Sequence, residues 1–389
     1  MKSTELAKIL APFGLLANKH AMSLVYKTLE ITADTIRGCA PWGILEVSAE
    51  IGIKDTVYID ATQFVNMVKT LPVAEITFEQ TATTLSWECR SETASAEGKF
   101  ALLGKVDIPT HDWEATATEK ANTAAEFIEA LQLGALCARR DISMASSGVN
   151  GVSLTWEEAD DKTHEGLVYI TSSDNITMSV ATTVIDGAAH WPSNIVINTD
   201  AATMLGTILS IPAKQEGSKD DAKPTTGAFL DIQEKCIIAY TGDLNFRLMV
   251  RATQPFQHDI LALTKEFPRE EITTKMPTDT VKRFIARATG AAEAKAHTQV
   301  GIMASSKGLR LSFSEGTVAS AEDYKLTDLT LPDDFPVIRL DALKLARALG
   351  HADMLALDAF DRGVLSLFTS KGRAPEFAYL INGAKEKGA

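Results

Sequence analysis

The stretch Val57–Leu71 changes its hydrophobic pattern partway along, from that of a strand to that of a helix. Val57–Ile59 predicts the end of a strand. Asp60 can cap the helix that follows, because its carboxylate can accept from the free N–H groups of the first turn. Pro72 then ends the helix. Apolar residues at helical spacing predict one buried face: Phe64, Val65, Met67, Val68 and Leu71.

The same pattern returns twice, in Ile195–Leu209 and in Phe335–Leu349. Asn198 is the predicted cap of the second copy, whereas Asp341 falls slightly late in the third and is a less clear cap. The three copies end about 140 residues apart, and a repeat of this length predicts three copies of one domain. The expected apolar faces are Met204, Leu205, Ile208 and Leu209 in the second helix, and Leu343, Leu345, Ala346 and Leu349 in the third.

A chain of 389 residues suits roughly two to four domains, and the repeat favours three. We place them at residues 1–118, 119–266 and 267–389. Each reads as helix, strands, helix, strands, and the first of these helices is expected near Thr4–Leu16. The strands are antiparallel and the helices lie on one face of the sheets, so the fold class is α+β.

Charge is distributed unevenly. The net charge of −13 argues against a nucleic-acid binder, but that sum ignores where the charges lie. Basic residues gather on or beside the predicted helices, and they could form one basic surface if every domain turned its helices to the same side. For any single residue, a solvated helix face is the simpler explanation. The residues are Lys8, Lys69, Arg139, Arg140, Lys214, Lys282, Arg283, Arg287, Lys344 and Arg347.

Motifs of catalysis are missing. The sequence has no phosphate-binding glycine loop followed by lysine, no HExxH and no GxSxG, and its histidines are scattered singly. The acidic run Glu157–Lys162 matches no metal-ligand spacing and is most simply a hairpin tip. We therefore expect no catalytic residue, no cofactor and no metal. Missing motifs do not exclude an enzyme, since a site can assemble from distant residues.

Cysteine spacing and hydropathy indicate the cellular compartment of the protein. Cys39, Cys89, Cys137 and Cys236 stand far apart, which predicts reduced thiols in a cytoplasmic protein. No apolar run reaches transmembrane length, so no membrane partner is expected.

Local matches resemble one family, the bacterial-type DNA polymerase sliding clamps, the beta subunit of DNA polymerase III. VYIDATQFVNMVKTLP followed by EITFE resembles its strand, helix and next strand. Lys99–Leu103 before IPTHDWE resembles the strand and exit loop that close the first domain, and Tyr379–Ile381 resembles the C-terminal strand. Together with the three equal domains, the resemblance covers nearly the whole chain, and its departures are compatible with a divergent phage member.

The resemblance implies three DNA-clamp domains with helices inside and sheets outside a ring. Two copies would meet head to tail as a homodimer, encircle double-stranded DNA without reading its sequence, and tether the polymerase as a processivity factor in a bacterial or phage-infected cell. Polymerase and clamp loader would bind through short peptides. At the dimer interface the implied residues are Phe100, on the strand that closes domain one, and Gly290 and Ala291, where the family commonly has larger apolar residues.

The resemblance also implies a client-peptide pocket between domains two and three. The family usually has a Gly-His-Arg-like turn there, whereas this chain has SSDNI, and the chain continues past Asn382 with a further tail. By position, the implied pocket residues are Ser172, Ser173, Asp174, Asn175, Ile176, Met178, Pro255, Phe256, Leu380, Ile381 and Asn382.

Two other functional classes compete with the clamp. A non-catalytic three-domain interaction scaffold unrelated to DNA would have no closed ring and no basic lining. An enzyme acting in a cleft between domains would bring polar residues with perturbed pKa values into one pocket. We favour the clamp, because the basic residues recur with the repeat.

Overall fold

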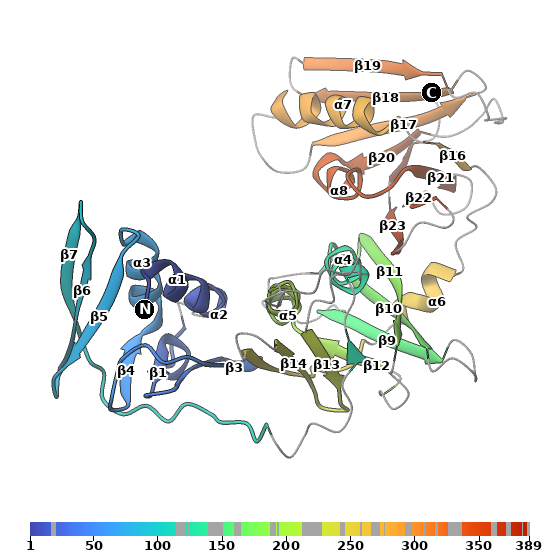
Figure 1. Ribbon diagram of the computed structural model, residues 1–389. Helices are drawn as coiled ribbons and strands as arrows, with labels where there is room; N and C mark the ends of the chain where they lie inside the picture. The colour runs from blue at the N-terminus through green and yellow to red at the C-terminus, as the bar shows by residue number, and fades with distance from the viewer. Residues whose placement is uncertain are drawn as a thin grey trace, which may run out of the picture. The chain divides into compact units, whose positions relative to one another are not determined.

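The chain is built from short helices and antiparallel strands (Figure 1). The computed structural model describes residues 1–16, 21–113, 121–122, 125–138, 151–158, 165–186, 192, 194–211, 228–241, 246–256, 259–265, 273–275, 277–291, 298–305, 308–315, 318–325, 337–358, 364–370, 375–382 and 384–386. The contacts divide it into two compact units. Unit 1 comprises residues 1–128, 158–166 and 185–253, and unit 2 comprises 129–157, 167–184 and 254–389.

Unit 1 contains an eight-stranded sheet in the order β4-β1-β2-β3-β15-β14-β13-β8. Strand β3 of the first repeat pairs with β15 of the second, from Val47 opposite Phe246 to Gly43 opposite Val250. A three-stranded sheet, β5-β6-β7, completes the first repeat. The bounds are β1 Thr28–Ile31, β2 Thr35–Ala40, β3 Gly43–Ser48, β4 Val57–Asp60, β5 Glu75–Gln80, β6 Thr84–Arg90, β7 Ser95–Ala101, β8 Ala121–Asn122, β12 Asn194–Ile197, β13 Ala228–Ile232, β14 Cys236–Thr241 and β15 Phe246–Arg251.

The first helix predicted from the sequence is two helices, α1 (Ser3–Leu10) and α2 (Phe13–Leu16). Pro12 separates them, because it lacks the N–H that would continue the helical hydrogen bonding. Both pack on α3 (Ala61–Thr70), and α2 also contacts β2 (Figure 1). A Cβ on Gly38 of β2 would lie 3.0 Å from the Leu16 side chain, so this side of the sheet is the helix-covered side. Unit 1 also holds the short 3-10 helix η1 (Leu24–Lys27) and α5 (Thr199–Leu209).

Unit 2 is also built around antiparallel sheets. One sheet runs in the order β9-β10-β11-β23-β22-β21-β16, and a five-stranded sheet runs β19-β18-β17-β20-β24. Strand β11 of the second repeat pairs with β23 of the third. The bounds are β9 Val152–Glu158, β10 Glu165–Ser173, β11 Thr177–Asp186, β16 Thr273–Lys275, β17 Gln299–Ser305, β18 Gly308–Glu315, β19 Val318–Tyr324, β20 Val337–Asp341, β21 Met354–Asp358, β22 Val364–Phe368, β23 Glu376–Asn382 and β24 Ala384–Glu386.

Four helices belong wholly or mainly to unit 2: α4 (Ala125–Gly134), α6 (Ile260–Lys265), α7 (Thr278–Ala291) and α8 (Ala342–Ala348). Helix α7 packs on α8 and on strands β18 and β19 (Figure 1). Because the strands of the second repeat pair with those of the first and of the third, its residues are shared between the two units. The three-domain division read from the repeat stays a prediction.

All three repeated helices, α3, α5 and α8, have the caps that the sequence predicts. Each cap accepts from backbone N–H groups of the first turn: Asp60 from Gln63 at 2.8 Å, Asn198 from Asp200 at 2.8 Å, and Asp341 from Leu343 and Lys344 at 2.9 and 3.0 Å. Asp341, the unclear case in the sequence, therefore caps α8 directly.

The apolar face predicted for α8 is partly wrong. Leu345 and Leu349 are buried as expected, but Leu343 is 48% exposed and Ala346 is exposed too. The helix starts directly after Asp341, and the buried residues are Ala342, Leu345, Ala348 and Leu349. Counted from Ala342, the buried positions follow one another at intervals of three or four residues, which is the spacing of one helix face.

Candidate nucleic-acid and partner interfaces

Several of the predicted basic residues are exposed cations on helices. Lys8 lies on α1, Lys69 on α3, Lys282 and Arg283 on α7, and Arg347 on α8. All are exposed, and none forms an ion pair with another residue that the structure describes. These side chains are therefore available to an external anion such as a phosphate.

Two other predicted cations already have a partner. Arg287 of α7 pairs with Glu322 of β19, and its guanidinium lies 5.7 Å from the centre of the Phe284 ring. Lys344 Nζ of α8 lies 3.0 Å from Asp174 Oδ2, and both side chains are largely buried. Their charges are partly neutralised within the protein, so they are weaker candidates for DNA contact.

Helices of the second repeat add no cation to this set. Helix α4 carries Glu126 and Glu129, and α5 carries Asp200, but neither has a lysine or arginine. Arg139, Arg140 and Lys214, which the sequence assigns to the ends of these helices, lie outside the described residues. Apart from Lys265, the last residue of α6, the lysines and arginines on the described helices come from the first and third repeats.

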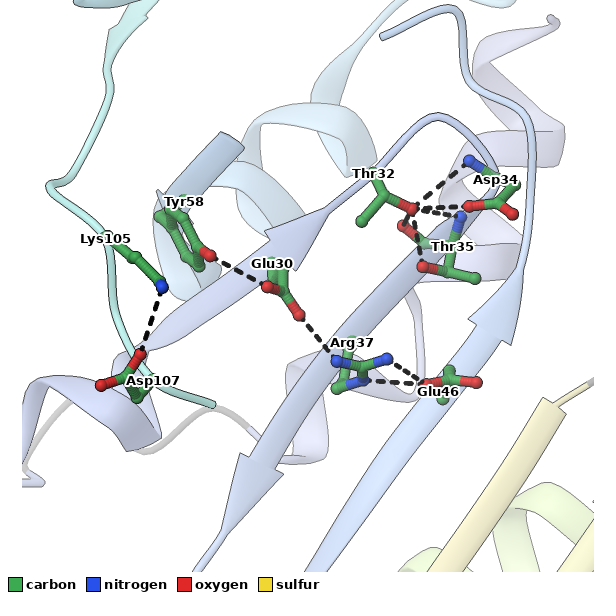
Figure 2. A network of polar contacts seen from close by, with 9 residues as sticks. All are labelled: Glu30, Thr32, Asp34, Thr35, Arg37, Glu46, Tyr58, Lys105 and Asp107. Atoms are coloured by element: carbon green, nitrogen blue, oxygen red, sulfur yellow. Dashed lines mark hydrogen bonds and ion pairs between the residues drawn. The ribbon is translucent and has the colours of Figure 1, made fainter. Parts of the chain in front are cut away.

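The opposite face of the unit 1 sheet carries a row of paired charges. Side chains alternate along a strand, and Gly38 marks the helix-covered side, so Arg37 points to the other side. Arg37 NH1 donates to Glu30 Oε2 of β1 at 2.9 Å, and Arg37 Nε donates to Glu46 Oε2 of β3 at 2.8 Å (Figure 2). The hydroxyl of Tyr58 on β4 donates to Glu30 Oε1 at 3.0 Å.

This charged row crosses from the first repeat into the second. Arg247 of β15 stands directly opposite Glu46 in the β3–β15 pairing, with NH1 3.8 Å from Glu46 Oε1. Glu46 is only 6% exposed, so these arginines contact a carboxylate that water largely cannot reach. The row is absent from the predictions made from the sequence, although its signal is present there: Glu30, Arg37 and Glu46 lie at matching positions of consecutive strands and alternate in sign.

An apolar anchor lies on the same face. Val106 and Ile108 are buried against Ile44 and Met249, which stand opposite each other across the β3–β15 seam. The exit loop expected after β7 is therefore attached at its start, and it covers the place where the two repeats join. The ion pair Lys105–Asp107, 3.9 Å apart, lies on this segment (Figure 2).

Four of the eleven residues assigned to the client pocket are buried. Ser172, Ser173, Leu380 and Ile381 are at most 4% exposed. Ser172 Oγ donates to the Gly134 carbonyl at 2.6 Å, so it links the end of α4 to β10. Such side chains can support a binding surface from beneath but cannot form its contact face.

The turn between β10 and β11 is an exposed part of the predicted pocket. Asn175 is exposed with φ of 72°, and Ile176 is 46% exposed, while Asp174 and Met178 are half-buried. Burial alone would raise the pKa of Asp174, but hydrogen bonds from Thr177 and Lys344 outweigh it and hold that pKa below its ordinary value. Of the others, Pro255 is exposed, Phe256 is half-buried, and Asn382 ends β23 opposite Val364.

The predicted dimer residues lie on the first and third repeats. Phe100 is on β7, a strand at the edge of its sheet, with its ring 5.7 Å from the Phe64 ring of α3. It is half-buried and therefore packs within its own repeat as well. Gly290 and Ala291 end α7, and a Cβ on Gly290 would meet no atom within 4 Å.

The described part of the chain has neither a metal-binding cluster nor a disulfide. It holds no group of three or more His, Cys, Asp or Glu residues able to bind a metal. All four cysteines are free, and burial raises the pKa values of Cys39 and Cys137 to about 11, so these thiols are protonated near neutral pH. Asp160 and Asp161 of the acidic run lie outside the described residues. Among the described helices, none combines the length and apolarity that crossing a bilayer would require.

Comparisons with known proteins agree on the fold. No family model matches the sequence, and no curated protein matches it. Solved structures of bacterial DNA polymerase III beta subunits match the whole chain at low identity. The DnaN sliding clamp from Bartonella birtlesii, bound to griselimycin, has a TM-score of 0.77 at 13% identity, covering 99% of this chain and 98% of that one.

Two further structures match equally well in extent. The DNA polymerase sliding clamp from Caulobacter crescentus has a TM-score of 0.76 at 11% identity, and the beta subunit from Streptococcus pyogenes has 0.74 at 12%. Each comparison covers 99% of both chains. The α+β clamp fold predicted from the sequence resemblance is therefore confirmed.

Proposed function

We propose that this protein is a DNA sliding clamp: a non-catalytic ring that encircles duplex DNA and tethers a replicative polymerase as a processivity factor. The observation that carries the proposal is the placement of charge on the clamp fold. Lys8, Lys69, Lys282, Arg283 and Arg347 are exposed on helices and lack an ion-pair partner among the described residues, although the chain's net charge is −13. The sheet face of unit 1 that lies away from the helices pairs its charges internally.

Helix cations of this kind suit a protein that must slide. Contacts from lysine and arginine to phosphates give affinity without reading sequence, and they exchange easily from one phosphate to the next. A face whose acids and bases neutralise each other offers DNA no comparable attraction. The alternative, a scaffold unrelated to DNA, gives no reason for this difference.

The proposed ring is a homodimer of three-domain chains, with boundaries at 1–118, 119–266 and 267–389. We propose that β7 of one copy pairs head to tail with β19 of its partner. Both strands stand at an edge of their sheets, and edge strands carry unpaired backbone groups that favour pairing. We also propose that a polymerase and a clamp loader bind the β10–β11 turn through short peptides, and that this occurs in the cytoplasm. The neighbour from Bartonella birtlesii is bound to griselimycin, and we propose that this compound also binds here.

Removing the helix cations should weaken DNA retention. We expect the variant Lys69→Ala, Lys282→Ala, Arg283→Ala, Arg347→Ala to leave nicked circular DNA faster than the wild type after loading with ATP and a bacterial clamp loader. The dependence of log affinity on log salt should flatten by at most about 0.9 for each phosphate that the variant no longer neutralises. Stability should change little, because these side chains are exposed.

Cutting the DNA circle separates a ring from an ordinary binder. Wild-type protein should remain on the closed circle and slide off once the DNA is linearised. Equal retention on circular and linear DNA would contradict encirclement. Unchanged retention of the four-site variant at several salt concentrations would contradict the assignment of these cations.

Ring assembly should depend on β7. We expect light scattering to give twice the chain mass of 41.9 kDa for the wild type, and Phe100→Asp to weaken the dimer roughly hundredfold, because it places an unpaired charge at an apolar edge. Phe64→Leu is the matched control, since it loosens the same aromatic contact from α3 without changing the edge strand. Equal dimer loss in both variants would mean that the effect acts through folding of the first repeat, and would count against β7 as the interface.

A further inference from the structure

Asp174 of the β10–β11 turn divides its two oxygens between different partners. Oδ1 accepts from the Ile176 N–H at 3.1 Å, the Thr177 N–H at 2.7 Å and the Thr177 hydroxyl at 2.8 Å. These bonds fold the turn on itself. Oδ2 lies 3.0 Å from Lys344 Nζ, on α8 of the third repeat. The same carboxylate therefore shapes the turn and attaches it to a helix that is distant in sequence.

Lys344 is held from two sides. Its side chain is 16% exposed and that of Asp174 is 12% exposed, so water screens this pair much less than it screens a surface ion pair. Its backbone carbonyl accepts from the Tyr379 hydroxyl of β23 at 2.9 Å, and Tyr379 is fully buried. Lys344 thus connects the start of α8 both to the β10–β11 turn and to β23.

The turn lies at one end of the seam between the second and third repeats. Thr177 begins β11 and pairs with Ile381 of β23, and Met178 pairs with Leu380. Ile176, just before this seam, is 46% exposed, and Leu343, next to Lys344 on α8, is 48% exposed. Each residue of the largely buried ion pair therefore has an exposed aliphatic residue within two positions of it along the chain.

We propose that the Asp174–Lys344 ion pair is a positioning element of the client site, holding the Ile176 turn at a set distance from α8 so that an apolar ligand meets a preformed surface. This rests on the proposed function, and it assigns a structural task to Lys344, which the sequence predicts as a DNA contact. A preformed surface binds more tightly because little freedom is lost on binding. Without the pair, the turn keeps its own hydrogen bonds but loses its attachment to α8.

Because the two oxygens act separately, a substitution can isolate the attachment. Asp174→Asn keeps an oxygen for the turn and replaces the oxygen that faces Lys344 with an amide N–H₂. Lys344→Met keeps most of the side-chain length and removes the charge. We expect each variant to weaken griselimycin binding, measured by calorimetry on the full-length protein, roughly tenfold. Hydrogen exchange of the Ile176 and Thr177 amides should also become faster in Lys344→Met.

Two matched variants separate positioning from general effects. Arg347→Met removes an exposed cation from the same helix and should leave griselimycin affinity unchanged. Lys344→Arg can still reach Asp174 and should restore affinity to within about twofold, which a loss of packing alone would not predict. Wild-type affinity in Lys344→Met, together with unchanged amide exchange, would overturn the proposal.

The outcomes also distinguish this inference from the clamp assignment. If the wild type stays on circular DNA but does not bind griselimycin, the client-peptide pocket lies elsewhere. Amide hydrogen exchange at Ile176 and Thr177 in Lys344→Met then still decides whether the ion pair holds the turn. If the wild type shows no preference for circular DNA, the clamp function fails while the griselimycin and exchange results stand on their own.

Discussion

Gly43→Ala is expected to destabilise unit 1 by about 3 kcal/mol, the upper end of what overpacking usually costs. A Cβ at this position would lie 2.4 Å from the Met249 carbonyl oxygen, closer than two such atoms can approach. The contact is with backbone, so no side chain can rotate away to relieve it. The strand must shift, and the β3–β15 pairing that joins the first two repeats must shift with it.

Urea unfolding of the two proteins would measure this cost, and amide exchange across β3 and β15 would locate it. Gly104→Ala is the control, because a Cβ there would meet nothing within 4 Å; we expect a change within about 0.5 kcal/mol. A similar midpoint for both variants, with slow exchange retained in β3, would show that the seam tolerates the extra methyl group.

Arg37→Met is expected to lower the free energy of unfolding by about 3 kcal/mol. This is near the lower end of the range for breaking a buried ion pair, because Arg37 remains 21% exposed. The substitution leaves Glu30 without its cation and leaves Glu46 with only Arg247, 3.8 Å away. Glu46 has an 8% exposed side chain, so water can do little to solvate its charge. The penalty is mainly that of an uncompensated buried carboxylate.

A second substitution tests that explanation. Adding Glu46→Met to Arg37→Met removes the stranded charge, and we expect it to recover much of the lost stability in thermal unfolding. Arg247→Met should cost under about 1 kcal/mol, since that arginine is 40% exposed and more distant from Glu46. A double variant no more stable than Arg37→Met would mean that the row acts through packing instead of charge.

The sequence predicts the features that depend on residues close together along the chain. The three strand–helix copies, their caps at Asp60, Asn198 and Asp341, and the α+β class follow from side-chain types and spacing that act within a few residues. Pro12, which separates α1 from α2, is visible in the sequence, but the apolar run through Leu16 favours a single helix. The face of α8 was misjudged because apolar spacing does not show which of two overlapping sets of positions meets the sheet.

The residues of the candidate sites are harder to predict from the sequence than the helices and strands are. Sequence position placed Ile176 and Asn175 on an exposed turn, as the client site requires, but it also assigned Ser172 and Leu380, which are buried. Burial of a strand residue depends on segments that are distant in sequence: Ser172 of β10 lies at the end of α4, and Leu380 of β23 pairs with Met178 of β11, about two hundred residues away along the chain. No local pattern carries that information.

Residue types and their spacing therefore predict the repeat, its helices with their caps, and the recurrence of cations on or beside the helices. Which of these cations remain available depends on the folded structure: Arg347 is exposed, while Lys344, three residues earlier on α8, is bound to Asp174 of another repeat. The folded structure also decided that Glu30, Arg37, Glu46 and Arg247 form one row across the β3–β15 seam. The physical reason is that helix and cap formation depend on neighbours along the chain, whereas ion pairing and burial depend on distances between segments that only folding brings together.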